Sequence, residues 1–367
     1  MILQPDINPV ANIYTRRNEM NLCLNCMEEY EEHLSICPHC EYKEDKLLHR
    51  EYCLPSGMIL NSENNSYLLG KCIDSDISGV VYIAWDNNYK RKVAIREYIP
   101  SQLSSRHRND LTIHIYKENQ EEFKKLMDKF VAEANLLRKI DDECCVKIFD
   151  IFFKHNTAYI VMEFVEGIVL KEFIFENGKI NHKIAINMLM PIMIGIEKLH
   201  SMSEIYMSIN AENIKVTKEG NLKIFDLSFV KYQLWNKAHR DCCAILLCNE
   251  CMPFELFIDD IKEGTYTDIY SLASILYMMI TGNVVECAYD RWVELKEYGK
   301  DALEPISRFN KNVPKNIANA IYNGINIEIK DRTQSIREFI DELASDKTVK
   351  LRVKQFSIID RFKQKFR

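Results

Sequence analysis

Two polar clusters flank a predicted β-hairpin in the middle of the chain. The apolar segments IKV and LKIF are separated by EGN (residues 219–221), which is typical of a tight turn because glycine accepts the backbone angles that a reversal needs. The hairpin would carry Glu212 and Asn213, just before its first strand, to the same end as Asp226, just after its second. Amide and carboxylate oxygens held in this way are hard ligands, suited to Mg²⁺ beside phosphates.

A second group of possible ligands lies near the start of the chain, in the pattern C-x2-C-x10-C-x2-C. Each C-x-x-C turn can place two thiolates on one ion, so two turns close a tetrahedral zinc site without an open catalytic position. So short a segment would not fold alone without such a staple, and it resembles a zinc ribbon. We predict structural Zn²⁺, with His33 and His39 as bystanders; the alternative is four free thiols in a linker. The predicted ligands are Cys23, Cys26, Cys37 and Cys40.

Composition sets the broad class of the protein. The chain has 367 residues, of which 47% are hydrophobic and 28% charged, as in ordinary soluble globular proteins. Its net charge of −6 leaves no global basic surface for nucleic acid. Thirteen cysteines and a start without a signal-peptide pattern favour a reducing, cytoplasmic location.

The predicted hairpin and the residues before it resemble the catalytic and metal-binding loops of protein kinases, HRDxxxxN followed by DFG. YMS (residues 206–208) stands at HRD, and DLS stands at DFG. The resemblance implies that Asn213 and Asp226 would bind Mg²⁺ beside ATP. It also places Ser208 where the catalytic carboxylate would be, and Asn210 in the usual Lys or Ser position.

Residues 67–86 resemble the first two strands of the kinase small lobe and their glycine-rich loop, GxGxxG. Gly79 matches the last glycine, whereas Asp74 and Asp76 stand at the first two. Two carboxylates would repel a polyanion, by about 3 kcal/mol for each unit-charge contact near 5 Å at an effective dielectric of about 20. The alternative is a solvated hairpin tip with no ligand nearby.

Two further segments resemble the nucleotide side of the kinase cleft. VAIR (residues 93–96) is similar to the strand motif VAIK, with the wider, planar head of Arg96 in place of lysine. FVAEANLL, in a predicted helix over 121–140, resembles the αC helix and makes Glu133 the candidate partner of Arg96. AYIVMEFVEG resembles the last small-lobe strand and the hinge. The resemblance implies that the nucleotide base would be bordered by Ala94, Met162, Glu163 and Val165.

The large lobe is predicted from its own motifs. MPFE resembles the closing APE motif, so Glu255 would pair with Arg332. A long apolar helix resembles the central kinase helix, with Thr267 as its expected N-cap and Gly282 as its stop. Asp268 would then hold the backbone of the catalytic loop.

These features predict an α+β, two-lobed protein-kinase-like fold behind a zinc ribbon, in a bacterial serine/threonine kinase-like family. The small lobe would be mostly β with one long helix, and the large lobe mostly α. The expected division is a tail (1–20), ribbon (21–45), linker (46–60), small lobe (61–166), large lobe (167–345) and basic tail (346–367).

We interpret the chain as a degenerate member: a pseudokinase with a regulatory or scaffolding role and weak binding of ATP with Mg²⁺. An active serine/threonine kinase with non-standard residues and a nucleotide-free scaffold are the alternatives. A protein partner or protein substrate is expected in each case. The last 21 residues carry eight Lys or Arg and one Asp, with apolar residues on one helical stripe. They are a candidate for contact with anionic membrane or for packing on the large lobe.

Overall fold

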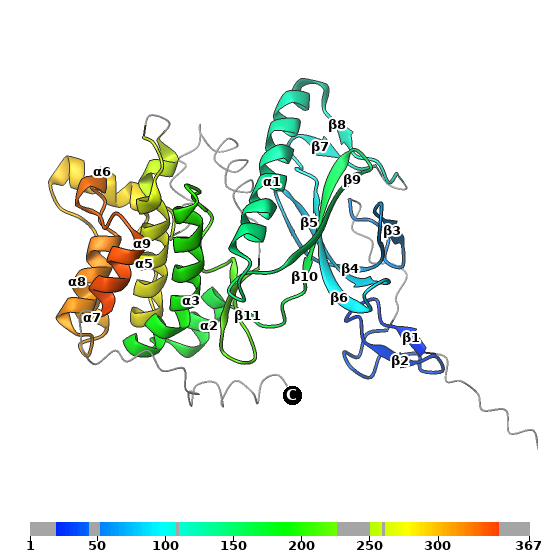
Figure 1. Cartoon of the computed structure of the whole chain (residues 1–367), viewed down its shortest axis with the longest axis horizontal. Coiled ribbons are helices and arrows are strands. Elements are labelled where there is room, and N and C mark those ends of the chain that lie inside the picture. Colours follow the sequence, from blue (N-terminus) through cyan, green and yellow to red (C-terminus); the bar gives the residue numbers. More distant parts are fainter. Residues whose placement is uncertain (1–19, 44–51, 108–109, 226–249, 259–260, 345–367) are drawn as a thin grey trace, which may run out of the picture.

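An antiparallel sheet in the order β3-β4-β5-β6-β10-β9 forms the small lobe of the computed structural model (Figure 1). The central strands β5 and β6 are buried at nearly every position and are rich in the β-branched and aromatic residues that favour strands. The structure describes residues 20–43, 52–107, 110–225, 250–258 and 261–344. The strands are β3 (Ile59–Asn61), β4 (Ser66–Asp76), β5 (Gly79–Asp86), β6 (Arg91–Tyr98), β9 (Ile148–Lys154) and β10 (Thr157–Glu163).

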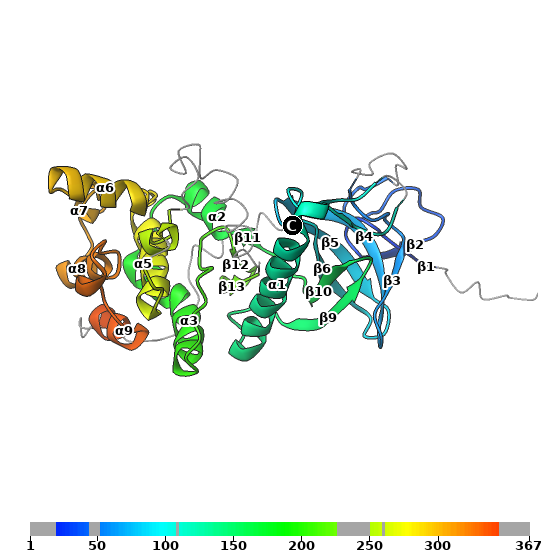
Figure 2. The same cartoon turned by 90° about the horizontal axis from the view of Figure 1, so that it is seen from above.

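One long helix, α1 (Gln120–Ile140), lies along this sheet on the side of the large lobe (Figure 2). The predicted helix over 121–140 is confirmed, because apolar residues at helical spacing bury one face. The rings of Phe123 and Phe130 pack on Tyr98 of β6, with centroids 4.9 and 5.4 Å apart. The short elements that precede α1 are β7 (Ser104–Ser105), β8 (His114–Ile115) and the 3-10 helix η1 (Lys117–Asn119).

The large lobe is built around α5 (Thr265–Thr281), in which every residue from Thr267 onward is buried. A helix that is apolar on all sides needs cover on all sides; α3, α8 and α9 all pack against it (Figure 2). The helices and 3-10 turns of this lobe are α2 (Leu170–Asn177), α3 (His182–Ser201), η3 (Phe254–Phe257), α6 (Ala288–Tyr298), α7 (Ile306–Phe309), α8 (Lys315–Gly324), η4 (Ile329–Asp331) and α9 (Ile336–Ala344).

The predicted N-cap of α5 was wrong by three residues. The helix begins at Thr265, with Gly264 as its N-cap, and Thr267 Oγ1 accepts a hydrogen bond from the Gly264 backbone N–H at 3.2 Å. Threonine can serve either as a cap or as the returning partner at the third helical position, so its identity does not decide between them. The predicted stop is confirmed: Gly282 has φ 72° and its N–H donates to Met278 O.

A small three-stranded sheet joins the lobes and contains the predicted hairpin. Its strands are β11 (Ile168–Val169), β12 (Ile214–Val216) and β13 (Leu222–Ile224), in that order. Gly220 supplies the turn with φ 86°. Among the helices in the described ranges, none combines the length and apolar character needed to span a bilayer.

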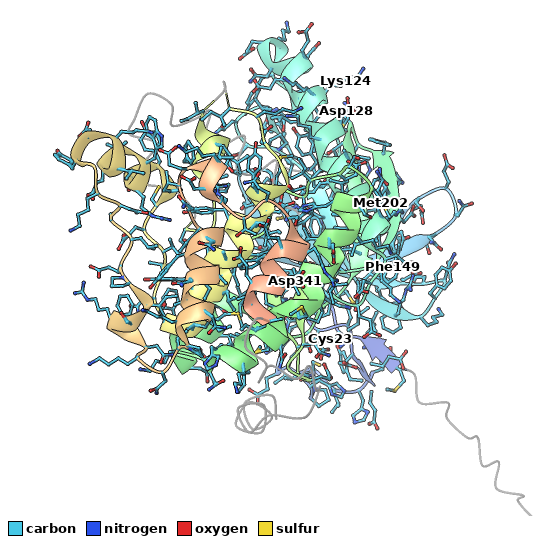
Figure 3. The ribbon with its side chains drawn as sticks, turned by 60° about the vertical axis from the view of Figure 1, so that its left-hand side comes forward. Cys23, Lys124, Asp128, Phe149, Met202 and Asp341 are labelled. Carbon is cyan, nitrogen blue, oxygen red and sulfur yellow. The ribbon has the colours of Figure 1, made fainter. Side chains whose placement is uncertain are left out.

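A hairpin of β1 (Met20–Leu22) and β2 (Glu29–Glu31) packs beside β4, at the end of the small lobe opposite the start of α1. Figure 3 labels Cys23 on this hairpin and Lys124 and Asp128 near the start of α1. The Lys71 N–H of β4 donates to Leu24 O at 2.8 Å. A Cβ at Gly70 would lie 2.4 Å from that same Leu24 oxygen, so the two backbones touch directly.

Candidate functional site

A cavity of about 380 Å³ lies between the two lobes. The small lobe contributes Asp74, from the end of β4, and the rest of the wall comes from the large lobe and its small sheet. The lining residues are Asp74, Val169, Lys171, Glu172, Phe175, Glu212, Asn213 and Phe225. The cavity therefore brings together the tip of β4 and the loop before β12, two of the segments that the sequence singled out.

The side chain of Asp268, on α5, holds the loop before β12 in place. This carboxylate accepts hydrogen bonds from the backbone N–H of Tyr206 at 2.9 Å and of Met207 at 2.7 Å. His200 Nε2, at the end of α3, lies 2.8 Å from the same carboxylate. Asp268 is fully buried, so these charge-assisted bonds act where water does not compete. The contacts therefore confirm the prediction that Asp268 holds the backbone of this loop.

The loop itself is shaped by its asparagines. Asn213 Nδ2 donates to the backbone oxygen of Ser208 at 2.6 Å, and Asn210 Oδ1 accepts from the N–H groups of Glu212 and Asn213. Ser208 is 2% exposed, and within the described residues its Oγ has no hydrogen-bond partner. Asn210 therefore holds the turn, Asn213 lines the cavity, and Ser208 supplies a buried hydroxyl where a carboxylate was expected in a kinase.

Asp226 lies outside the described residues. Its neighbour Phe225 lines the cavity, and the Phe225 N–H donates to Asn213 O at 2.9 Å. The expectation that Asn213 and Asp226 face one cleft therefore stays a prediction.

Lys171 is the cation of the cavity, and sequence reasoning missed it. Its Nζ lies 2.9 Å from carboxylate oxygens of both Glu212 and Glu250. Burial alone would lower the pKa of Lys171, but the hydrogen bonds to these two carboxylates outweigh it and raise the pKa. Lys171 therefore forms ion pairs that link α2 to the loop before β12 and to Glu250.

Arg96 faces the tip between β4 and β5 rather than open solvent. Its Nη2 lies 2.7 Å from Asp76 Oδ2 and 2.9 Å from Ser78 Oγ, and the arginine is 1% exposed. The interpretation of this tip as solvated was wrong for Asp76, because its carboxylate contacts the buried guanidinium of Arg96 and its side chain is 11% exposed. Glu133, the partner suggested by sequence, is buried in α1, and its pairing with Arg96 stays a prediction.

Gly79 is needed for packing against β6. A Cβ there would lie 2.0 Å from the backbone oxygen of Glu97, a distance that no side chain can occupy. Sequence reasoning assigned Gly79 to nucleotide binding, and that assignment stays a prediction. The close approach to β6 already accounts for the glycine.

The hinge residues lie on β10 and just after it. Ala94 and Met162 are register partners on β6 and β10, and both are buried. Lys223 Nζ contacts both carboxylate oxygens of Glu163, at 2.7 and 2.8 Å, and Lys215 Nζ donates to Val165 O at 3.0 Å. Two lysines of the small three-stranded sheet therefore tie the hinge to that sheet. The spacing of residues in the sequence does not predict these contacts.

The four cysteines near the start of the chain form a compact cluster. The Sγ atoms of Cys23, Cys26, Cys37 and Cys40 all lie within 4.8 Å of one another, and among the described ranges this is the one group of His, Cys, Asp and Glu placed to hold a metal ion. Asn25 Nδ2 donates to Cys40 Sγ at 3.2 Å. Burial raises the pKa of Cys26. Burial opposes ionisation of Cys40 too, but hydrogen bonds from the Asn25 side chain, the Tyr42 backbone and the neighbouring thiols together outweigh it and lower the pKa of Cys40 to about 7.

The comparisons with known proteins agree with this architecture. Residues 77–356 match the protein kinase domain family. This chain belongs to the protein kinase family. The kinase domain is similar to the solved structure "PpkA-294 apo form", with a TM-score of 0.67 and 23% sequence identity. The alignment covers 80% of this chain and 99% of that structure's chain. That likeness supports the two-lobed fold predicted from sequence.

Curated relatives of the kinase domain are bacterial and eukaryotic. A probable serine/threonine-protein kinase of Clostridium perfringens is 28% identical over 286 residues, which is 76% of this chain and 38% of the relative. The serine/threonine-protein kinase PrkC of Bacillus subtilis is 26% identical over 249 residues, which is 66% of this chain and 34% of the relative. The chain thus spans a little over a third of the length of these relatives.

Proposed function

We propose that this kinase domain is a pseudokinase, used for regulation or scaffolding, that retains weak binding of ATP with Mg²⁺. The observation that carries the proposal is Ser208. It stands in a loop held as a catalytic loop by Asp268, but it offers a hydroxyl that cannot accept a proton at neutral pH as a carboxylate does. Loss of a positioned base typically costs about 10²–10⁴ in rate. From kinase turnover of about 1–100 s⁻¹, this leaves slow phosphate transfer at best.

The residues present fit a nucleotide with its metal in part. Asn213 lines the cavity with an amide whose oxygen is a ligand type that Mg²⁺ prefers. Ala94 and Met162 are buried apolar register partners on β6 and β10, and they would border the base of a bound nucleotide. Asp226 would supply the carboxylate ligand. When bound, Mg²⁺ neutralises phosphate charge; the chain's own part is to hold Asn213 through its bond to Ser208 O.

Two observations favour the alternatives. The intact support of the catalytic loop favours an active kinase with non-standard residues, since phosphoryl transfer depends largely on positioning. The ion pair between Arg96 and Asp76 favours a nucleotide-free scaffold, because it engages the cation expected to meet phosphates. The relatives' names point to protein kinases, so a protein partner or protein substrate is proposed for each alternative.

We further propose that the cysteine cluster binds one structural Zn²⁺. The observation is the mutual approach of four sulfur atoms, which are the ligands that zinc takes in closed sites. Free thiols and a thiolate site both persist in reducing surroundings, which supports a cytoplasmic location.

Thermal melting with and without Mg-ATP tests nucleotide binding. At ten times its dissociation constant the ligand would stabilise the protein by about 1.4 kcal/mol, a rise in melting temperature of about 3–5 °C. We expect Asp226→Ala to abolish the Mg²⁺-dependent rise. The matched control is Asp341→Ala, which removes an exposed carboxylate of α9 and is expected to keep it.

Transfer of labelled phosphate from ATP, to the chain itself or to a generic substrate, separates the alternatives. We expect little transfer. Robust transfer abolished by Asp226→Ala would instead establish an active kinase. No melting shift with Mg-ATP in the wild-type chain would favour the nucleotide-free scaffold.

A further inference from the structure

Three groups on the small lobe that are suited to bind a nucleotide phosphate all contact one carboxylate of the chain. They are the backbone N–H groups of Ser78 and Gly79 and the guanidinium of Arg96, and each lies within hydrogen-bond distance of Asp76. We propose that Asp76 acts as an internal anion that occupies this phosphate position, so that a nucleotide must displace its carboxylate to bind. The proposal rests on the pseudokinase function above and names the residue that sets its weak affinity for phosphate ligands.

The two carboxylate oxygens of Asp76 accept hydrogen bonds from different partners. Oδ1 accepts from the Ser78 N–H at 2.7 Å, the Ser78 hydroxyl at 2.6 Å and the Gly79 N–H at 3.2 Å. Oδ2 accepts from Arg96 Nη2 at 2.7 Å. This arrangement combines backbone N–H groups with a cation, which are the two kinds of group by which proteins recognise phosphate oxygens.

The tip that carries Asp76 is held down on the neighbouring chain segment. Ser78 is 1% exposed, and the Ile99 N–H donates to its backbone oxygen at 3.0 Å. The Ser101 N–H donates to Ile77 O at 3.3 Å, just beyond β6. The close contact of Gly79 with Glu97 O leaves no room for the start of β5 to shift toward β6. Backbone hydrogen bonds therefore hold the tip that carries Asp76 to the segment just after β6.

Arg96 cannot easily leave this contact. It lies in the middle of β6, paired in register with Val81 of β5 and Ile160 of β10, and its side chain is 1% exposed. The Asp76 side chain is 11% exposed, so the ion pair is largely shielded from water. An incoming phosphate must replace Asp76 at a site where breaking a charged hydrogen bond costs about 1.5–3 kcal/mol.

Asp74 offers a matched comparison two residues away. Asp74 lines the cavity, and its carboxylate accepts a hydrogen bond from the Ser75 N–H at 2.8 Å. Substituting either aspartate by asparagine removes the same charge from the same tip. The change at position 76 removes a carboxylate that contacts Arg96, while an asparagine there keeps an acceptor for the Ser78 and Gly79 N–H groups.

Isothermal titration calorimetry on the full chain tests the inference with three probes: Mg-ATP, inorganic tripolyphosphate and adenosine. We expect Asp76→Asn to bind Mg-ATP and tripolyphosphate about 10-fold to 100-fold more tightly than wild type, from the cost of that charged hydrogen bond. Adenosine affinity is expected to stay within about twofold, because the change lies at the phosphates. Asp74→Asn is expected to gain less than Asp76→Asn, because it relieves through-space repulsion without removing a carboxylate that contacts Arg96.

A gain of equal size in both variants, or no gain in Asp76→Asn, would overturn the inference. Binding by Asp76→Asn together with no binding by wild type would support it, and would at the same time refute nucleotide binding by the natural chain. Should Asp76→Asn fail to fold, Ser78→Ala weakens the hold on Asp76 without a change of charge, because it removes the hydroxyl that donates to Asp76 Oδ1 and accepts from Arg96 Nη2. Its expected gain is about threefold, and a loss of tripolyphosphate affinity in that variant would count against the inference.

Discussion

The two lobes use buried ion pairs to different ends. In the large lobe, Arg332 holds Glu255 through two contacts, at 2.6 and 3.2 Å, and both side chains are fully buried. In the small lobe, Arg96 of β6 holds Asp76 at the end of β4. The first pair fastens a chain segment to the helical core, whereas the second engages a cation that a kinase would present to its nucleotide.

This difference separates the contacts that support the kinase fold from the groups that would bind phosphate and substrate. The supports of the catalytic loop and of the segment ending at Glu255 are the ones that a kinase fold requires. The groups that would meet phosphate and substrate are the ones that differ, at Ser208, Asp74 and Asp76. The contacts that support the catalytic loop can therefore persist while the groups that would meet phosphate and substrate change, because different residues supply the two.

The largest effect is expected from breaking the large-lobe pair. Arg332→Ala leaves the Glu255 carboxylate buried without its cation, and we expect a loss of about 3–5 kcal/mol in the free energy of unfolding, measured by urea denaturation. The control is Arg337→Ala, whose partner Asp341 is exposed on α9, with an expected cost below about 1 kcal/mol. Equal losses in the two variants would erase the distinction between structural and surface pairs.

An intermediate effect is expected at Asp268. The Asp268→Asn change keeps the shape but turns one acceptor oxygen into a donor that faces the N–H of either Tyr206 or Met207, so we expect a cost of about 2–3 kcal/mol by the same measurement. Asp76→Asn is the small-lobe counterpart, with an expected cost near 1 kcal/mol, because its acceptor toward the tip survives. A larger cost at Asp76 than at Asp268 would reverse the comparison.

The smallest effect on the kinase fold is expected from the ribbon. Cys37→Ser combined with Cys40→Ser is expected to lower zinc content from about one ion per chain to near zero, measured by atomic emission. Loss of the Leu24–Lys71 hydrogen bond would cost about 1 kcal/mol, or a fall of about 2–4 °C in melting temperature. His33→Ala removes an exposed side chain outside the cluster and should leave both values unchanged. Unchanged metal content in the cysteine variant would refute the zinc assignment.

Much of the frame was predictable because it depends on local patterns. The hairpin around Gly220, the apolar face of α1 and the Glu255–Arg332 pair all follow from spacing or motif, and the structure confirms them. The start of α5 was misplaced because threonine caps a helix from two positions. Lys171 was missed because its partners lie 41 and 79 residues further along the chain, and no short pattern joins them.

By itself, the sequence determined the two-lobed kinase fold, the spacing of the four cysteines and the replacement of the catalytic carboxylate by Ser208. These are statements about residue type and periodicity, which the order of the chain contains. Only the tertiary structure decided that Asp76 turns onto Arg96 and that Gly79 is needed against Glu97. The reason is physical: the register of β4, β5 and β6 sets which side chains meet across the sheet, and register comes from the packing of the whole lobe.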